Sequence, residues 1–303
     1  MQLFEMNRRS STLKKLLFVG WVLLLGASAN ANANASASAS AQDEVLANEL
    51  QLTGELTQGS LIRGTLPVGS EIKLNGKNIK ISSAGDFVFG FGRDAKLNHV
   101  VEYRLPTQSA FQKKTLTLSA REYDIQRIEG VAKKYVSPPA EVTKRIQADN
   151  RKIAKARATV SDLTAFQSDF ILPSKGRISG VYGSQRVFNG QPRRPHFGLD
   201  VAAPIGTAVV APADGVITLV HNDMYYSGGT LIMDHGMGVS STFIHLSKIH
   251  VKEGEVVKQG QLIADIGATG RVTGPHLDWR INWFKERLDP ALLVELPSAG
   301  SVD

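Results

Sequence analysis

The stretch "GPHLDWRINW" at residues 274–283 places two chemically capable side chains close together. His276 and Asp278 are two positions apart, so on a β-strand both would point to the same face of a sheet. An imidazole and a carboxylate on one face are suited to binding a metal ion or to exchanging protons with a substrate. Two side chains are too few for either kind of site, so the remaining groups must come from elsewhere in the chain.

Two other segments supply histidine. "RPHFGLD" at 194–200 contains His196 and Asp200 four positions apart, and its proline and glycine favour a loop entering a strand over a helix. "STFIHLSKI" at 241–249 places His245 inside an apolar run typical of a strand. Each histidine alone is explained as a hydrogen-bonded structural residue. Together, three segments that bring imidazole, two of them with carboxylate, predict one shared site.

The region that holds these segments has the pattern of a β-sheet protein. "APIGTAVVAPADGVITLV" (203–220) and "VKEGEVVKQGQLIADIG" (251–267) both place Gly or Pro turns between short Val and Ile runs. Helix signals are nearly absent from 176 to 280. We therefore expect a compact β-sandwich or barrel-like sheet over about 170–292, followed by a tail at 293–303.

The chain before this region divides into two further parts. Residues 50–121 alternate apolar and polar positions over short runs, which predicts a small β-sandwich domain. Within it, Asn75-Gly76 suits a type I′ hairpin turn, and His99 is a lone histidine that we expect to be structural. Residues 122–169 lack strand alternation and predict a helical linker. Its helix would span about 139–160, with Ser137 as cap and Pro138 in the first turn, which gives a mainly β protein overall.

The N-terminal residues 1–41 resemble an export signal. The basic run "NRRSSTLKK" is followed by twelve apolar residues at 16–27 and then by a low-complexity Ala/Asn/Ser segment. The apolar run is short for a membrane span, and cleavage is plausible after Ala29 or after Ala41. Met6 is an alternative start. The expected location is outside the cytoplasm, in the periplasm or cell envelope, with membrane contact only through this segment.

Composition narrows the chemistry further. The 303 residues carry a formal charge of +7, but four basic residues and one acidic residue lie before residue 42, so the rest of the chain carries +4. This mild excess gives no reason to expect a nucleic-acid partner. The chain has no cysteine, which excludes disulfides, a thiolate metal site and a cysteine nucleophile. Any metal must be held by histidine and carboxylate.

The C-terminal motifs, taken in order, resemble those of the M23 (lysostaphin/LytM-type) zinc metallopeptidases. That family has a His-x-x-x-Asp motif, a later histidine in an "HLS" context and a His-x-His pair in "TGPHLHF"-like sequence. Here "HFGLD", "IHLSKI" and "TGPHLDW" occur in that order, together with "GTAVVAPADGVI" and "GGTLIMDHGMG". The resemblance covers about 170–292 and implies the β-sandwich fold of that family.

The resemblance also implies roles for particular residues. His196 and Asp200 would bind zinc, and position 278 would supply the third ligand. His245 and His276 would assist the attacking water and the developing oxyanion. The implied activity is hydrolysis of peptide bonds in peptidoglycan, with its peptides as substrate and other cell-wall enzymes as further candidate partners.

Position 278 departs from the family pattern, because this chain has aspartate where the family has histidine; the wording "HLDW" in place of "HLHW" indicates a subgroup. Carboxylate oxygen is a competent zinc ligand. A second carboxylate neutralises the metal more fully than imidazole does, which would acidify a bound water less. Three outcomes stay open: an active enzyme with an altered site, a metal site that uses His276 as a substitute ligand, and a domain without catalysis.

The alternative function is a catalytically inactive relative that activates a cell-wall amidase through protein contact. Such regulators usually lack several ligands, whereas here one is changed, and to another competent ligand. Three arginines near the motifs, Arg193, Arg194 and Arg271, are candidates to bind carboxylates of a peptide substrate, with ordinary surface positions as the equal alternative. The sequence leaves open whether the N-terminal β domain positions the C-terminal domain on the wall or limits access to it.

Overall fold

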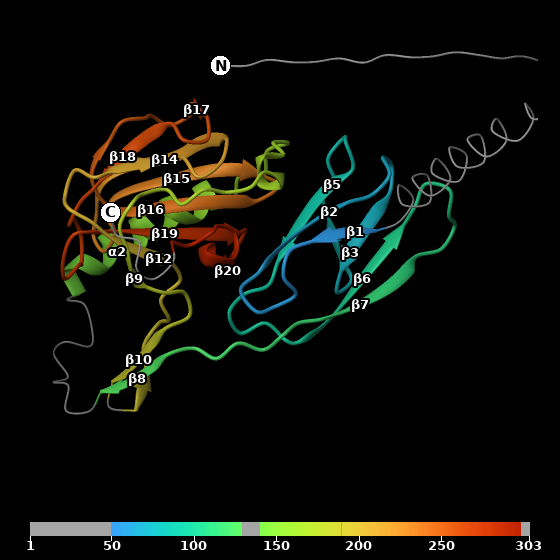
Figure 1. Ribbon diagram of the computed structural model, residues 1–303, viewed down its shortest axis with the longest axis horizontal. Helices are drawn as coiled ribbons and strands as arrows, with labels where there is room; N and C mark the ends of the chain where they lie inside the picture. The colour runs from blue at the N-terminus through green and yellow to red at the C-terminus, as the bar shows by residue number, and fades with distance from the viewer. Residues whose placement is uncertain (1–49, 129–139, 189, 298–303) are drawn as a thin grey trace, which may run out of the picture. The chain divides into compact units, whose positions relative to one another are not determined.

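The computed structural model (Figure 1) describes residues 50–128, 140–188 and 190–297. The expected signal segment at 1–41, the helix cap at 137–138 and the end of the tail lie outside these ranges. The described chain is mainly β, as the sequence predicts. Among its helices, none combines the length and the apolar character that crossing a membrane requires.

Residues 51–117 form seven strands in two antiparallel sheets. The first sheet joins β1 (Gln51–Thr53), β2 (Leu61–Thr65) and β5 (Asp86–Gly90). The second has the order β4 (Lys77–Ile79), β3 (Glu71–Leu74), β6 (Asn98–Arg104) and β7 (Gln112–Thr117). Side chains from both sheets bury one common core, which includes Ile62, Phe87, Phe89, Val101 and Leu116. The strands and their shared core agree with the expected β-sandwich, while the domain boundaries themselves stay a prediction.

Two local predictions in this part are confirmed. Asn75 and Gly76 connect β3 to β4 with positive φ angles of 50° and 78°, as a type I′ turn requires. His99 is structural: its Nδ1 lies 2.8 Å from Asn75 Nδ2, its Nε2 lies 2.7 Å from the Lys96 carbonyl oxygen, and its ring packs on Phe91. The histidine therefore holds the turn and the strand together.

The segment expected to be a helical linker is only partly helical. Helix α2 spans Ala140–Arg157, within the expected 139–160. Before it, however, β8 (Ile125–Ile128) pairs in parallel with β10 (Gln185–Phe188), which also pairs with β11 (Gln191–Pro192). No strand is expected here from the sequence. Four residues are too few to show alternation, and the strand is formed by pairing with a segment 60 positions away.

The C-terminal part is built on one large sheet. Its main path has the order β17 (Val256–Val257), β14 (Gly215–Met224), β15 (Gly228–Gly236), β16 (Val239–Ile249), β19 (His276–Trp283), β12 (Leu199–Ala202) and β9 (Arg177–Gly180). Beside this path, β18 (Leu262–Ile266) pairs with β16 and with β13 (Ala208–Val210), and β20 (Glu286–Leu288) pairs with β19. Two short 3-10 helices, η2 (Ala165–Gln167) and η3 (Pro290–Leu292), flank the region. No α-helix occurs among the described residues between 176 and 280, as expected.

The core of this sheet contains one buried polar chain. Trp279 Nε1 donates to Ser241 Oγ (3.2 Å), which lies 2.8 Å from His235 Nε2, and His235 Nδ1 lies 2.8 Å from the carbonyl oxygen of Asp214. Because a carbonyl can only accept, Nδ1 carries the proton and Nε2 accepts from the serine. Burial lowers the pKa of His235 to about 4, so the ring is neutral.

Helix α2 packs against β14 and β15 of this sheet (Figure 1). Ile153 and Ala156 contact Leu219, Met224 and Ile232 in a small apolar cluster. Polar contacts reinforce the packing: the backbone N–H of Tyr225 donates to Asp149 Oδ2, and Arg145 donates to Asp223. The C-terminal end of α2 thereby lies close to β16, where Arg157 Nη2 donates to Thr242 Oγ1 at 3.0 Å.

Candidate metal and catalytic site

The strand alternation of β19 separates a core face from a polar face. Leu277, Trp279 and Ile281 point into the hydrophobic core. The alternate positions, which are His276, Asp278, Arg280 and Asn282, lie on the other face. In the neighbouring antiparallel strand β12, Asp200 lies directly opposite Asp278. The sheet therefore makes two carboxylates from distant segments direct cross-strand neighbours, with their side chains side by side.

Histidine 196 completes a cluster with these two acids. One ligand atom from each of His196, Asp200 and Asp278 lies within 4.8 Å of the others. The loop before β12 places the histidine through two backbone hydrogen bonds, from His196 N to the Ser184 carbonyl and from Gly183 N to the His196 carbonyl. The side chains of His196 and Asp200 are 22% and 20% exposed, and that of Asp278 is 4% exposed. All three are thus largely withdrawn from water.

Two glycines leave the room that the carboxylates occupy. A Cβ atom at Gly198 would lie 2.0 Å from Asp278 Oδ1, and a Cβ atom at Gly180 would lie 2.2 Å from Asp200 Oδ2. Neither glycine has the positive φ that side chains avoid, so space is the reason that glycine suits both positions. Any larger residue would displace a carboxylate from the cluster.

The donor atoms fit a divalent metal ion. His196 Nε2 and Asp200 Oδ1 are buried, lie 3.1 Å apart and have no hydrogen-bond partner among the described residues. Burial by itself would lower the pKa of His196, but the neighbouring carboxylates of Asp200 and Asp278 outweigh it and raise that pKa. A bound cation would satisfy these buried ligand atoms, which have no hydrogen-bond partner and favour a positive charge between them. One imidazole and two carboxylates are a donor set that zinc accepts.

The third carboxylate has a second partner that sequence reasoning missed. Arg280 Nε donates to Asp278 Oδ1 at 2.9 Å, and Arg280 Nη2 donates to Asp278 Oδ2 at 2.5 Å. Burial would raise the pKa of Asp278, but the guanidinium outweighs burial and holds that pKa well below its usual range. Each carboxylate oxygen keeps a further lone pair, so Asp278 can pair with Arg280 and still offer an oxygen to a metal. The signal was present in the sequence, because Arg280 is two positions after Asp278 and so on the same strand face.

His245 lies beside the cluster in a strained backbone conformation. Its φ is +69°, which is uncommon for a residue with a side chain and occurs at sites where geometry is imposed for function. Its Nδ1 lies 2.8 Å from the carbonyl oxygen of Thr269 and must therefore carry the proton. Burial lowers the pKa of His245, so the ring is neutral near pH 7 and Nε2 has a free lone pair.

His276 is oriented in the same way. Its Nδ1 lies 2.9 Å from the carbonyl oxygen of Gly274, which again assigns the proton to Nδ1. The rings of His245 and His276 are 4.9 Å apart between centroids. The structure thus brings all five sequence-predicted residues of the motifs into one neighbourhood, with two imidazoles beside a three-donor cluster.

The three arginines expected to bind substrate lie in different surroundings. Arg271 stacks over the ring of Tyr226, with its guanidinium carbon 4.4 Å from the ring centroid. Arg194 lies over Phe197 at 5.6 Å, and the backbone N–H of Arg193 donates to the Arg186 carbonyl. Their role in binding substrate stays a prediction.

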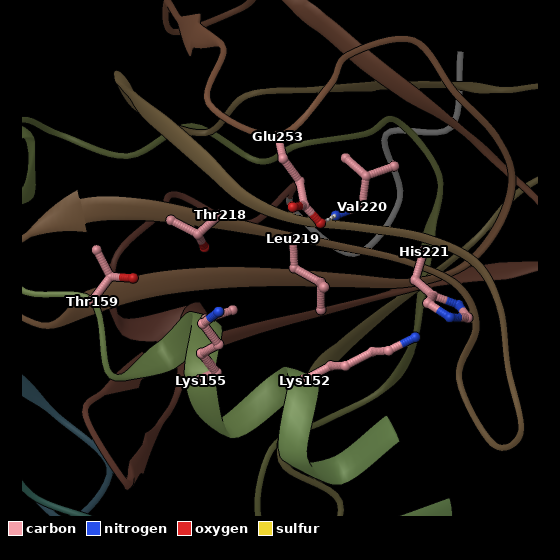
Figure 2. Close-up of a pocket in the computed structure, with 9 residues that line it drawn as sticks. Lys152, Lys155, Thr159, Thr218, Leu219, Val220, His221 and Glu253 are labelled. Atoms are coloured by element: carbon pink, nitrogen blue, oxygen red, sulfur yellow. Dashed lines mark hydrogen bonds between the residues drawn. The ribbon is translucent and has the colours of Figure 1, made fainter. Parts of the chain in front are cut away.

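Two cavities lie away from the cluster. One, of about 350 Å³, lies between α2 and β14, where Lys152, His221 and Glu253 are among its lining residues (Figure 2). The other, of about 780 Å³, is lined mainly by apolar side chains next to β9, β12 and β13. Neither lining set contains a predicted site residue. The chemistry therefore points to the polar face of β19 rather than to either cavity.

Comparison with known proteins identifies the family that the C-terminal region matches. Residues 194–290, which contain all three motifs, match the family model "Peptidase family M23". Residues 194–290 are therefore an M23 peptidase region of this chain. A crystal structure of a candidate M23 peptidase from Pseudomonas aeruginosa is 28% identical to this chain. It covers 79% of this chain and 95% of its own length, with a TM-score of 0.60.

Two curated relatives are similar to part of this chain. The peptidoglycan DD-endopeptidase ShyA of Vibrio cholerae is 34% identical over 213 residues, which is 70% of this chain and 46% of ShyA. The DD-carboxypeptidase/endopeptidase Mpg of Neisseria meningitidis is 46% identical over 122 residues, which is 40% of this chain and 28% of Mpg. The chain therefore spans less than half the length of these relatives.

Proposed function

We propose that this protein is an exported zinc metalloendopeptidase that hydrolyses peptide bonds in peptidoglycan. The single observation that carries the proposal is the convergence of His196, Asp200 and Asp278 within 4.8 Å, with the neutral His245 beside them. The relative ShyA, which is named as a peptidoglycan DD-endopeptidase, supports the substrate class. Since peptidoglycan lies in the cell envelope, this substrate also agrees with the expected export signal.

Zinc would be held by His196, Asp200 and Asp278. When bound, zinc polarises a substrate carbonyl and lowers the pKa of water. The charge of the donor set decides how far it does so. The family pattern of two histidines and one aspartate contributes one negative charge. Here Asp278 adds a second negative charge. The positive guanidinium of Arg280, which is paired with Asp278, brings the net charge back to one negative charge. We infer that Asp278 and Arg280 act together as a neutral unit in the place of histidine. The second carboxylate then no longer reduces how strongly the metal acidifies a bound water.

The two imidazoles would handle protons. His245 Nε2 carries a free lone pair, because Nδ1 is committed to the Thr269 carbonyl, and it is placed to take a proton from the attacking water and return it to the leaving amine. His276, whose Nδ1 is held by the Gly274 carbonyl, would turn Nε2 toward the carbonyl oxygen and, when that nitrogen carries a proton, donate to it as negative charge develops there. The strained backbone of His245 and the two carbonyl contacts fix both rings before substrate arrives.

Digestion of purified sacculi tests the proposal. We expect the zinc-loaded protein to release soluble muropeptides, and His245→Ala to release far fewer while it keeps its zinc. If the two proteins release equal amounts, His245 has no part in catalysis. If neither releases any, the alternative of an inactive relative that activates an amidase becomes the better account, and adding an amidase to the assay would then reveal stimulation.

A further inference from the structure

Three arginines that the proposed mechanism does not use as catalysts gather along the polar face of β19. They come from separate elements: Arg157 from the end of α2, Arg280 from β19 and Arg287 from β20. Arg157 Nη2 donates to Thr242, which lies directly opposite Arg280 in the ladder between β16 and β19. This places the two guanidiniums next to each other on the same face.

Arg287 joins the other end of this row. Its Nη1 donates to Asn282 Oδ1 at 3.2 Å, and Asn282 follows Arg280 on the polar face of β19. The backbone of Arg287 is fixed as well, because Tyr182 donates its hydroxyl to the Arg287 carbonyl oxygen at 2.6 Å. The row of guanidiniums is therefore anchored by strand pairing and by hydrogen bonds, and it adjoins Asp278.

The row has more positive charge than the neighbouring acids can neutralise. Burial lowers the pKa of Arg157 and of Arg287, and the other arginines lower both further, including Arg194. Among the described residues, Asp278 is the carboxylate that raises the pKa of Arg157, and both oxygens of Asp278 already accept from Arg280. Arg157 Nε is buried and has no hydrogen-bond partner among the described residues. Within the described part of the chain, Arg157 and Arg287 thus have no carboxylate of their own next to the proposed catalytic centre.

We propose that Arg157 and Arg287 form an anion-binding site that receives a free carboxylate of the peptide substrate, next to the bond to be cleaved. The planar donors of a guanidinium match a carboxylate geometrically, and a buried arginine without an anion gains most from one. The proposal rests on the proposed function, because the substrate is a peptide that lies across His245 and His276. It assigns to α2 and β20 a part in substrate selection, which sequence reasoning gave only to Arg193, Arg194 and Arg271.

Two peptides test this inference without any change to the site. Both contain the same D-alanyl bond, and the residue beside that bond carries either a free carboxylate or the corresponding carboxamide. Binding is measured by calorimetry on zinc-loaded His245→Ala, which should not turn the peptides over. A charge-assisted hydrogen bond corresponds to roughly a 10- to 100-fold difference in Kd, so we expect the carboxylate peptide to bind that much more tightly. Equal Kd values would overturn the proposal.

Variants then assign the preference to a residue. Arg157→Gln in the same background should weaken binding of the carboxylate peptide about tenfold and leave binding of the amide peptide unchanged. Lys152→Gln is the matched control, because Lys152 lies on the same helix but faces the cavity of Figure 2. A merely structural role for Arg157 would change binding of both peptides alike, which would contradict the assignment. If Arg157→Gln does not fold, the comparison of the two peptides on the unaltered site still decides.

The outcomes separate this inference from the proposed function. A carboxylate preference in binding, with no cleavage of either peptide by the unmodified protein, would support the anion site and refute the endopeptidase. Cleavage of both peptides with equal kcat/KM and equal binding would support the endopeptidase and refute the anion site.

Discussion

The pairing of Asp278 with Arg280 predicts that Asp278→His, which restores the residue type of the family motif, will harm this protein. The substitution removes the carboxylate that accepts both hydrogen bonds from Arg280 and leaves the guanidinium beside a neutral ring. Breaking a buried ion pair from one side costs about 3–5 kcal/mol. The Asp278 side chain is 4% exposed, but that of Arg280 is 23% exposed, and solvent reduces the loss. We therefore expect a loss of about 2–3 kcal/mol.

Thermal unfolding of the metal-free protein measures this loss. For a domain of this size, about 2–3 kcal/mol corresponds to a decrease in Tm of roughly 5–10 °C. Exchanging both partners avoids the unpaired charge, so Asp278→His/Arg280→Gln should recover most of the stability. Zinc content after dialysis should fall in the single variant and return in the double variant, whose donor set carries the family's single negative charge.

Two results would refute this reasoning. The first is a single variant as stable as the unmodified protein, which would mean that Arg280 does not depend on Asp278. The second is a double variant no more stable than the single one, which would mean that the two residues do not act as a unit.

Three further predictions concern the site and the core. Gly198→Ala places a Cβ atom 2.0 Å from Asp278 Oδ1 and should weaken zinc binding about 10- to 100-fold in chelator competition. Gly274→Ala is the control, because its Cβ atom would have no other atom within 4 Å, and it should leave zinc binding unchanged. Equal effects of the two variants would contradict the steric explanation. His235 has a folded pKa of about 4 against an ordinary 6.5, so the unfolded chain binds the proton first and stability falls as pH decreases through this window. The stabilisation of the unmodified protein over His235→Gln should shrink by about 2 kcal/mol between pH 6.5 and 5 in urea unfolding, and a constant difference would show that His235 is not held neutral. His245→Ala should lower the rate of peptide cleavage about 10²- to 10⁴-fold with zinc content retained, and loss of zinc would instead assign His245 to the metal.

The sequence predicts much of the sheet and most of the side chains of the site, because both are visible in local sequence patterns. Alternation in "HLDWRINW" separates Trp279 and the core from the polar face, and the pairing of His196 with Asp200 is visible as a spacing. The turn at Asn75-Gly76 is likewise set by two residues that tolerate positive φ. Such features need no knowledge of distant contacts.

Other features arise only from tertiary packing. The strand β8 exists because β10 pairs with it, and its four residues carry no pattern of their own. The approach of Arg157 to β16 depends on how α2 packs on the sheet, which the sequence of the helix does not specify by itself. Arg280 is an intermediate case: its spacing from Asp278 was visible, but the hydrogen bonds that change the charge of the site follow from side-chain conformation.

A zinc titration of the metal-free protein, followed by cleavage of a purified cross-linked muropeptide dimer, tests the central claim most directly. Bound zinc and the rate of conversion to monomers are measured on the same samples. The account predicts that the rate rises in proportion to bound zinc and reaches its maximum at about one zinc per chain, since one cluster of three donors is present among the described residues. Cleavage by the metal-free protein, or no cleavage at full occupancy, would contradict it.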